Sequence, residues 1–251
     1  MSVVEMLNVS VMLGGTDVLD DISMHVAEGE FVSILGPSGA GKTTILRLLT
    51  GALRQDRGAI TCNGRPLAQY QQGFAFMPQR DALLPWCRIL DNLTLGLEVQ
   101  GMARNDARAR VLPLLNDFGL TGFEQHYPAQ LSGGMRQRAA LLRTIVQARP
   151  VQLLDEPFGA LDALTRTHMQ TWFEKRWRTA RWTTLLVTHD VREAVALSDR
   201  IYVLSRRPAH VIAEVAVPAR RPRLGHPTGM DAHGLETHLL DILLNQTGDT
   251  P

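Results

Sequence analysis

The feature that most constrains this chain is a glycine-rich stretch at residues 36–43 that ends in lysine and threonine. Its residues are Gly36, Pro37, Ser38, Gly39, Ala40, Gly41, Lys42 and Thr43. The apolar run 31–35 before it is typical of a buried parallel strand, and residues 44–49 after it carry apolar side chains at helical spacing. Strand, glycine-rich turn and helix form the setting in which this pattern predicts a phosphate-binding P-loop.

The chemistry of such a loop comes mainly from its backbone. Successive N–H groups form a concave nest for phosphate oxygens, and the helix that begins there adds the positive end of its dipole. We expect Gly36, Gly39 and Gly41 to adopt conformations that a side chain would forbid. We expect Lys42 to reach the β- and γ-phosphates and the Thr43 hydroxyl to hold Mg²⁺. The alternative, a glycine-rich turn without a ligand, leaves the agreement of all the fixed positions unexplained.

Composition narrows the class of protein. The chain has 251 residues, a hydrophobic fraction of 45% and a mean hydropathy of -0.06, which are typical of a soluble globular protein. No apolar run approaches the roughly 18 residues that span a bilayer, and residues 1–5 lack the features of a secretory signal. Cys62 and Cys87 stand alone, which predicts a reducing compartment and hence the cytoplasm. The net charge of +1 argues against nucleic acid as a partner.

Hydrophobic patterning predicts strands at both ends of the chain and helices between them. The expected strands are 3–11 and 18–27, which form an antiparallel pair, then 31–35, 57–62, 74–77, 151–155, 183–187, 201–204 and 211–215. From about residue 89 to residue 147 the apolar spacing is helical only. The helix expected over 103–118 contains Pro113, which must kink it or split it in two. A further helix is expected over 163–179.

This order of elements predicts an α/β fold with a P-loop (RecA-like) core. A mainly parallel sheet would be flanked by helices, with an antiparallel β part at the N-terminus and an inserted helical subdomain at about 85–147. We expect the ATPase-type domain to span 1–222. A short tail, 223–251, would hold one possible helix near 235–244.

Two adjacent carboxylates follow the predicted strand 151–155. Asp155 would orient Mg²⁺, directly or through water, and Glu156 would act as a general base on the attacking water. A single charged residue at a strand end is commonplace. An adjacent pair in a chain that also carries a P-loop favours the catalytic interpretation.

A second anion site is predicted where Ser132, Gly133 and Gly134 open a helix, because a hydroxyl and free N–H groups meet there. One ATP needs only one phosphate nest, so the second nest suggests that another subunit presents it. The stretch Leu131-Ser132-Gly133-Gly134-Met135 resembles the signature of the ATP-binding-cassette (ABC) ATPases, usually written LSGGQ. The motifs of that family occur in its order over roughly residues 3–217. Met135 replaces the usual glutamine, while the groups that bind the anion are retained.

The resemblance implies further roles, with ATP and Mg²⁺ as cofactors and a head-to-tail homodimer as the working unit. Gln79 matches the Q-loop glutamine, Asp162 the D-loop, and His189 the switch histidine at the γ-phosphate. The implied catalytic residues are Lys42, Glu156 and His189, and the implied metal ligands are Thr43, Gln79 and Asp155. The implied ATP-binding residues are Leu13, Gly36, Pro37, Ser38, Gly39, Ala40, Gly41, Lys42, Thr43, Thr44, Gln79, Ser132, Gly133, Gly134 and Asp162. Leu13 stands where the family often has an aromatic residue on adenine, so weaker nucleotide binding is expected.

Residues 80–86, 90–93, 131–138 and 203–208 are similar to the nitrate/sulfonate/taurine-type importer ATPases, a branch that also serves pyrimidine precursors. The resemblance implies a membrane permease at Leu84, Pro85 and Trp86. It also implies an indirect extracytoplasmic solute-binding protein and a position at the cytoplasmic face of the plasma or inner membrane. The alternative for 84–86 is a hydrophobic turn packed on its own subdomain.

ABC ATPases also act in processes other than transport, and these classes have their own sequence features. DNA-repair cassettes usually carry long coiled coils or zinc modules, and translation factors hold two cassettes. Neither feature occurs here. A soluble ABC-type ATPase in cofactor or complex assembly stays open as the alternative.

Overall fold

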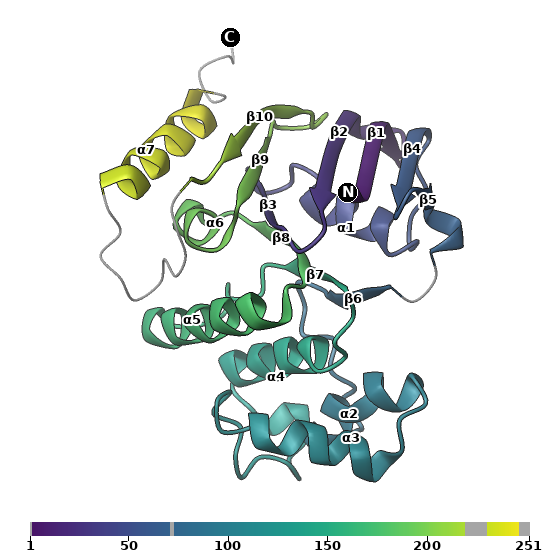
Figure 1. The fold of residues 1–251 in the computed structure, drawn as a ribbon, viewed down its shortest axis with the longest axis vertical. Coiled ribbons are helices and arrows are strands. Elements are labelled where there is room, and N and C mark those ends of the chain that lie inside the picture. The colour runs from purple at the N-terminus through teal and green to yellow at the C-terminus, as the bar shows by residue number, and fades with distance from the viewer. Residues whose placement is uncertain (1, 71–72, 219–229, 246–251) are drawn as a thin grey trace.

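The computed structural model describes residues 2–70, 73–218 and 230–245. Six strands of this part of the chain form the larger sheet (Figure 1). In spatial order they are β10 (Val211–Ala216), β9 (Arg200–Leu204), β3 (Phe31–Leu35), β8 (Thr183–Thr188), β7 (Val151–Asp155) and β6 (Phe74–Met77). All neighbouring pairs are parallel except β9 and β10, so the predicted mainly parallel sheet is confirmed.

Strand β3 explains why the P-loop is anchored firmly. All five of its residues are buried. Phe31 packs towards α5, where the ring centroids of Phe173 and Trp177 lie 5.9 and 5.8 Å from it. Val32 and Ile34 belong to the hydrophobic core on the other side of the sheet. A strand covered on both faces is the expected environment for a continuous apolar run.

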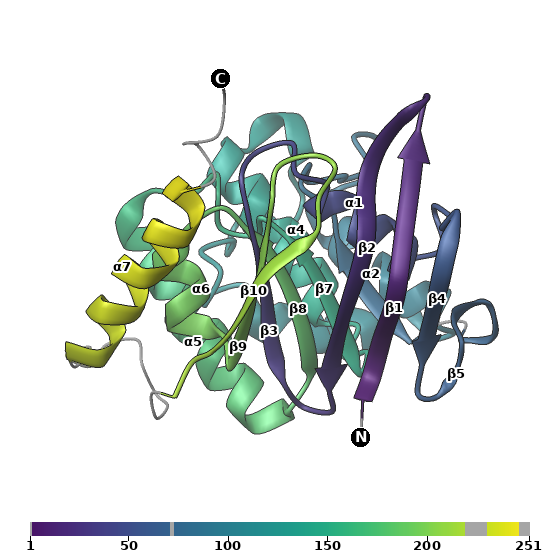
Figure 2. The ribbon, with the colours of Figure 1, turned by 90° about the horizontal axis from the view of Figure 1, so that it is seen from above.

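A smaller antiparallel sheet lies beside the larger one (Figure 2). Its described strands are, in spatial order, β2 (Thr16–Ala27), β1 (Ser2–Leu13), β4 (Arg57–Cys62) and β5 (Arg65–Pro66). The pairing of β1 with β2 confirms the predicted N-terminal antiparallel part. Helix α1 (Lys42–Leu49) fills the space between the sheets: Ile45 and Leu46 share one core with Val9 of β1 and Leu153 of β7.

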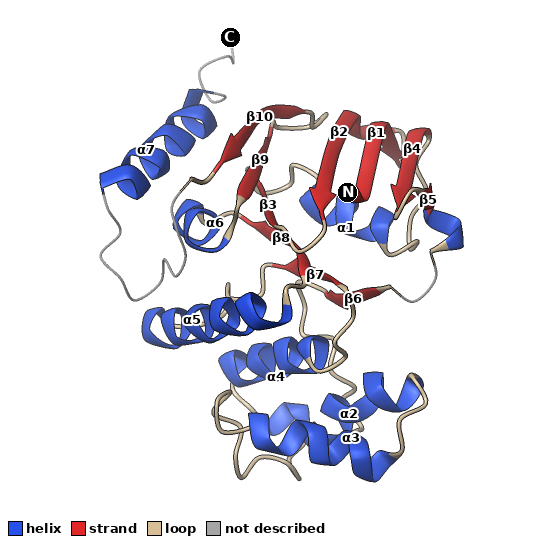
Figure 3. Ribbon diagram, viewed as in Figure 1, coloured by secondary structure: helices blue, strands red, loops and turns tan. Residues whose placement is uncertain are grey.

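The segment between β6 and β7 contains helices, turns and loops but no strand, as predicted, and forms the lower part of the molecule (Figure 3). It holds α2 (Ile89–Val99), α3 (Arg104–Val111), α4 (Gly133–Ile145) and the short 3₁₀ turns η2 (Leu112–Leu114) and η3 (Pro128–Gln130). Pro113 ends α3, because the chain continues into η2 instead of the helix. The helix predicted over 103–118 therefore ends earlier than expected, at Val111, and residues 115–118 form turns instead of a second helix.

The remaining described elements are η1 (Leu67–Gln69), α5 (Ala163–Ala180), α6 (Val191–Leu197) and α7 (Met230–Asn245). The sequence patterns did not indicate α6. Helix α7 is longer than the predicted 235–244 and packs on α6, where Leu239 is fully buried beside Val195. The predicted division at 222/223 lies outside the described residues and stays a prediction. No helix in the described ranges has the length and apolar character needed to cross a membrane.

Candidate nucleotide-binding site

The P-loop joins β3 to α1, and two of its glycines are required by backbone conformation. Gly39 and Gly41 have φ of 81° and 100°, in the left-handed region. A Cβ on Gly41 would also lie 2.9 Å from Cδ2 of Leu19. Gly36 differs from the prediction, because its φ is not in that region. Its constraint is close approach: a Cβ there would lie 3.2 Å from both Cβ and the carbonyl oxygen of Leu204.

Lys42 is held inside the loop. Its Nζ donates to the carbonyl oxygens of Gly36 and Pro37, each at 2.8 Å, and the residue is buried. Burial lowers the pKa of Lys42, and the nearby carboxylates of Glu156 and Asp155 oppose that shift. A phosphate in the loop would meet this ammonium directly, because the carbonyls already hold it at the nest.

Thr43 and Asp155 meet at the start of α1, although 112 positions separate them in sequence. The Thr43 hydroxyl donates to Oδ2 of Asp155 at 2.8 Å. Among the described residues, Oδ1 of Asp155 has no hydrogen-bond partner although it is buried. Burial raises the pKa of Asp155, partly offset by the Thr43 hydrogen bond. A buried, unpaired carboxylate oxygen beside a hydroxyl fits Mg²⁺, which prefers few protein oxygens plus phosphate.

Glu156, His189 and Gln79 converge at the carboxyl ends of neighbouring strands. Glu156 follows β7 with a φ of 48°, and its N–H donates to Val187 at 2.9 Å. Nδ1 of His189 lies 3.1 Å from Oε1 of Glu156, while Nε2 of Gln79 lies at a longer 3.4 Å from Oε2. A carboxylate only accepts, so the first contact requires a proton on Nδ1 of His189. This edge of a parallel sheet is where ligands bind in such folds.

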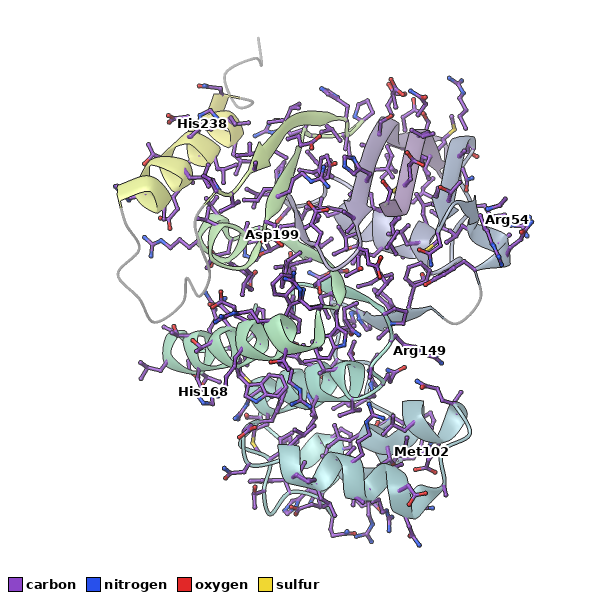
Figure 4. All side chains as sticks on the ribbon, viewed as in Figure 1. Arg54, Met102, Arg149, His168, Asp199 and His238 are labelled. Carbon is purple, nitrogen blue, oxygen red and sulfur yellow. The ribbon has the colours of Figure 1, made fainter. Side chains whose placement is uncertain are left out.

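Two of the other described histidines lie elsewhere. His168 on α5 and His238 on α7 are exposed and lie well away from the strand ends that carry Glu156 (Figure 4). They take no part in the convergence.

The segment Ser132–Gly134 begins α4 in the helical part of the molecule. The Ser132 hydroxyl caps the helix by accepting the N–H of Met135 at 3.2 Å, and Ser132 and Gly133 are exposed. No hydrogen bond between described residues joins this segment to the P-loop. Asp162 caps α5 in the same way: Oδ1 accepts the Thr165 N–H at 3.0 Å, which holds the pKa of Asp162 below its ordinary value.

The position expected to face adenine is only half open. Leu13 ends β1 and is partly buried against the core between the sheets. Met12 beside it is 52% exposed. The role of Leu13 stays a prediction.

The loop Leu84–Trp86 presents an aromatic side chain outward. Trp86 is 72% exposed, so it does not pack on its own subdomain. The loop is fixed from behind by Asn92, which is fully buried on α2. Its Nδ2 donates to the carbonyls of Leu84 and Cys87 at 3.1 and 3.0 Å, and its Oδ1 accepts the Leu84 N–H at 2.7 Å. A rigid loop with an exposed tryptophan is an anchor of the kind found in protein interfaces.

Sequence reasoning missed residues that support the site from behind. Gln137 on α4 donates to the carbonyls of Glu156 and Pro157 at 3.0 and 3.1 Å. Glu193 on α6 is buried behind the loop of His189. Asp190 followed by Glu193 is a helix-start pattern that could have indicated α6. No sequence pattern marks Gln137, whose contact depends on packing.

The fold and the glycine-rich loop between β3 and α1 together define a P-loop nucleoside triphosphatase. The chain belongs to the ABC transporter ATP-binding family: the ABC transporter family model matches residues 19–159. The sequence resemblance is confirmed, and the chain is an ATP-binding ATPase.

Similar proteins and similar solved structures support the same family assignment. The chain is 45% identical over 201 residues, 80% of this chain and 78% of the relative, to the formylaminopyrimidine import ATP-binding protein ThiZ of Halalkalibacterium halodurans. It is 42% identical over 84% of each chain to the taurine import ATP-binding protein TauB of Yersinia pestis. The dimeric ABC cassette MJ0796 superimposes with a TM-score of 0.78 at 29% identity, covering 86% of this chain and all of that one. A post-hydrolysis dimer of that cassette with ADP and Pi matches equally well.

Proposed function

We propose that this chain is the ATP-hydrolysing subunit of an importer for a small solute of the taurine, sulfonate, nitrate or pyrimidine-precursor type. The observation that carries the proposal is the presence of two phosphate-binding half-sites in one chain. One is enclosed around Lys42, and the other, Ser132–Gly134, is exposed. The names of the relatives, all import ATP-binding proteins, support transport over assembly of a soluble complex.

In the proposed mechanism the P-loop N–H groups and Lys42 hold the β- and γ-phosphates of ATP. Thr43, Asp155 and Gln79 would hold Mg²⁺, which supplies positive charge against the phosphate oxygens. Glu156 accepts a proton from the attacking water, and His189 stays hydrogen-bonded to it through Nδ1. These roles are supported by proximity: the side chains of Asp155, Glu156 and His189 lie at the carboxyl ends of β7 and β8, and Thr43 at the start of α1 donates to Asp155.

The exposed half-site implies a second copy of the chain. In a two-fold dimer the Ser132 hydroxyl and the N–H groups of Gly133 and Gly134 from one copy would face the ATP on the P-loop of the other. Asp162 and the 85% exposed Leu164 would lie near that interface. ATP closes the dimer and hydrolysis reopens it.

A permease would receive this cycle at Leu84, Pro85 and Trp86. Asn92 fixes this loop by donating to the carbonyls of Leu84 and Cys87. The loop would therefore move together with the helical part of the chain and push on the permease. The chain would then sit at the cytoplasmic face of the membrane through the permease. An extracytoplasmic solute-binding protein would deliver the solute without contacting this chain.

The two cysteines allow a direct test. Cys62 is buried and its pKa is raised to about 11, so its thiol should resist alkylation, whereas Cys87 is partly exposed beside Trp86. We expect maleimide to label Cys87 in the purified chain. The labelling should slow markedly when the chain is purified in complex with a membrane permease.

Two variants complete the test. Trp86→Ala should lose the permease, while Leu240→Ala, which removes an exposed side chain on α7, should keep it. Unchanged Cys87 labelling in the presence of that permease would contradict the importer assignment. It would favour a soluble assembly ATPase instead.

A further inference from the structure

A buried carboxylate that the proposed mechanism does not use lies behind the loop of His189. Glu193 on α6 is only 6% exposed, and both of its oxygens are hydrogen-bonded. Oε2 accepts the hydroxyl of Thr188, the last residue of β8, and Oε1 accepts Nε2 of Gln170 on α5 at 3.2 Å. Thr188 and Gln170 are buried as well. Glu193 therefore joins the end of β8 to α5 through two hydrogen bonds shielded from water.

The Thr188 hydroxyl is used in both directions. It accepts the N–H of Asp190 at 3.0 Å and donates to Glu193. A hydroxyl has one proton to donate, and the Thr188 oxygen already accepts the Asp190 N–H, so its proton is available for Oε2 of Glu193. The turn Thr188–Asp190, which carries His189, is thus fixed from inside by Glu193.

A second link reaches the beginning of α5. Nη1 of Arg166 lies 3.5 Å from Oδ2 of Asp190, and Nη2 of Arg166 donates to the carbonyl of Leu161 at 3.2 Å. Leu161 directly precedes Asp162, the residue expected near the dimer interface. The turn of His189 and the start of α5 are therefore connected on two sides, by Glu193 and by Arg166.

A small cavity of about 40 Å³ separates this cluster from the reacting groups. Its lining includes Glu156, His189, Arg166, Thr188, Asp190 and Glu193. Within the described part of the chain, the Glu193 side chain makes no hydrogen bond to Glu156 or His189. Any effect on hydrolysis must therefore pass through the turn.

We propose that Glu193 is a positioning residue for ATP hydrolysis, which holds His189 at a fixed place relative to α5 through Thr188 and Gln170. The proposal rests on the proposed function, because it assigns His189 to the γ-phosphate. A second copy that contacts Asp162 would influence the position of His189 through the link from Leu161 to Arg166 and Asp190. Burial of Glu193 would then serve to keep these bonds free of competing water.

The test uses a matched pair at Thr188 together with Glu193→Gln. Thr188→Val removes the hydroxyl and nearly keeps the shape, while Thr188→Ser keeps the hydroxyl. We expect Thr188→Val and Glu193→Gln to lower kcat for ATP about tenfold or more, because small misplacements of reacting groups are costly. The KM for ATP should change less than about twofold, and Thr188→Ser should retain most of the activity.

Controls separate the two proposals. Wild type and Lys42→Ala are assayed in parallel, with melting temperatures for all variants. If wild type hydrolyses ATP and Lys42→Ala does not, the proposed function stands, and unchanged kcat in Thr188→Val and Glu193→Gln overturns only the role of Glu193. Lower melting temperature with unchanged kcat would likewise show a merely structural role. Absence of hydrolysis in the wild type would overturn the proposed function and this inference with it.

Discussion

The P-loop and the segment Ser132–Gly134 both place backbone N–H groups at the start of a helix, yet the chain holds them differently. The P-loop is enclosed around Lys42: Gly41 sits against Leu19, and Lys42 is bound to two carbonyls of its own loop, while Ser38 and Gly39 are exposed. Ser132 and Gly133 are exposed, and the Ser132 side chain is bonded only within its own helix cap. One nest is completed by its own chain. The other is open to solvent, as the proposed pairing with a second copy requires.

The largest expected effect concerns the enclosed half-site. Lys42→Ala should lower the ATPase kcat by about 100-fold or more, because it removes a charge aimed at the transferring phosphate. Steady-state phosphate release measures this. Lys175→Ala is the matched control, since Lys175 is the only other lysine and is exposed on α5. Substantial turnover by Lys42→Ala would remove the phosphate-contact assignment.

Mixing variants tests whether the exposed half-site acts on another copy. Ser132→Arg should block the exposed nest and abolish activity without unfolding the chain, because Ser132 lies at the surface. A mixture with Lys42→Ala should regain ATPase activity. The mixed dimer pairs the intact P-loop of one variant with the intact Ser132 of the other. A mixture that stays inactive although cross-linking shows mixed dimers would argue that the two nests do not face each other.

Glu193, which is buried behind the loop of His189, should make the free energy of unfolding depend on pH. Burial raises the pKa of Glu193 from 4.5 to about 7. The folded chain therefore binds more protons than the unfolded chain between these values, and stability from this group falls as pH rises from about 4.5 to 7. The shift corresponds to about 3 kcal/mol. Relative to wild type, Glu193→Gln should gain free energy of unfolding over this range.

Urea unfolding of both proteins at pH 5 and pH 8 measures this difference. The neighbouring charges Asp190 and Arg166 are retained in the variant. A difference in unfolding free energy that is the same at both pH values would mean that Glu193 does not titrate in this window.

Alanine substitutions at Gly41 of the P-loop and at Gly134 of α4 should differ in their effect on stability. Gly41→Ala should destabilise the chain by about 1–3 kcal/mol, because the residue must keep a positive φ. Gly134→Ala meets its nearest neighbour at an ordinary 3.6 Å in a helix and should be neutral or stabilising by up to about 1 kcal/mol. Urea unfolding compares them. Equal destabilisation by both would erase the distinction between the enclosed and exposed nests.

The smallest expected effect is at the predicted adenine position. Leu13→Tyr should tighten ATP binding by about 0.5–1.5 kcal/mol through stacking. Met12→Tyr is the companion variant, because Met12 is the more exposed of the two. Titration with a fluorescent ATP analogue measures both. Equal affinity of wild type and Leu13→Tyr would show that this residue does not cover the base.

Much of the fold was predictable because its signals are local. The continuous apolar run before Gly36 predicts a strand buried on both faces, and β3 is buried in all five residues. Pro113 ends the helix before it through the clash and lost N–H that any proline brings, so α3 stops at Val111. The antiparallel pair β1 and β2 follows from alternating side chains around Gly14 and Gly15.

Other features had no local signal. Asn92 supports the loop of Trp86 only because α2 packs there, and nothing in its neighbours distinguishes it from a solvent-facing asparagine. Gln170 and Glu193 lie 23 positions apart, and only the packing of α5 against α6 brings them into contact. The φ of Gly36 was predicted wrongly for a related reason. Its constraint comes from Leu204 on a neighbouring strand, which the P-loop pattern does not contain.

By itself, the sequence determined the chemistry: a contiguous loop that can bind phosphate, two adjacent carboxylates after a strand, and a second nest at a helix start. These depend on short-range geometry, which a few neighbouring residues specify. Tertiary structure decided how the pieces act together. It joined Thr43 to Asp155, placed Glu156 beside His189, buried Glu193 behind them and left Ser132 exposed. Such contacts arise from the packing of distant segments, because burial and hydrogen bonding across elements are fixed only when the whole core forms.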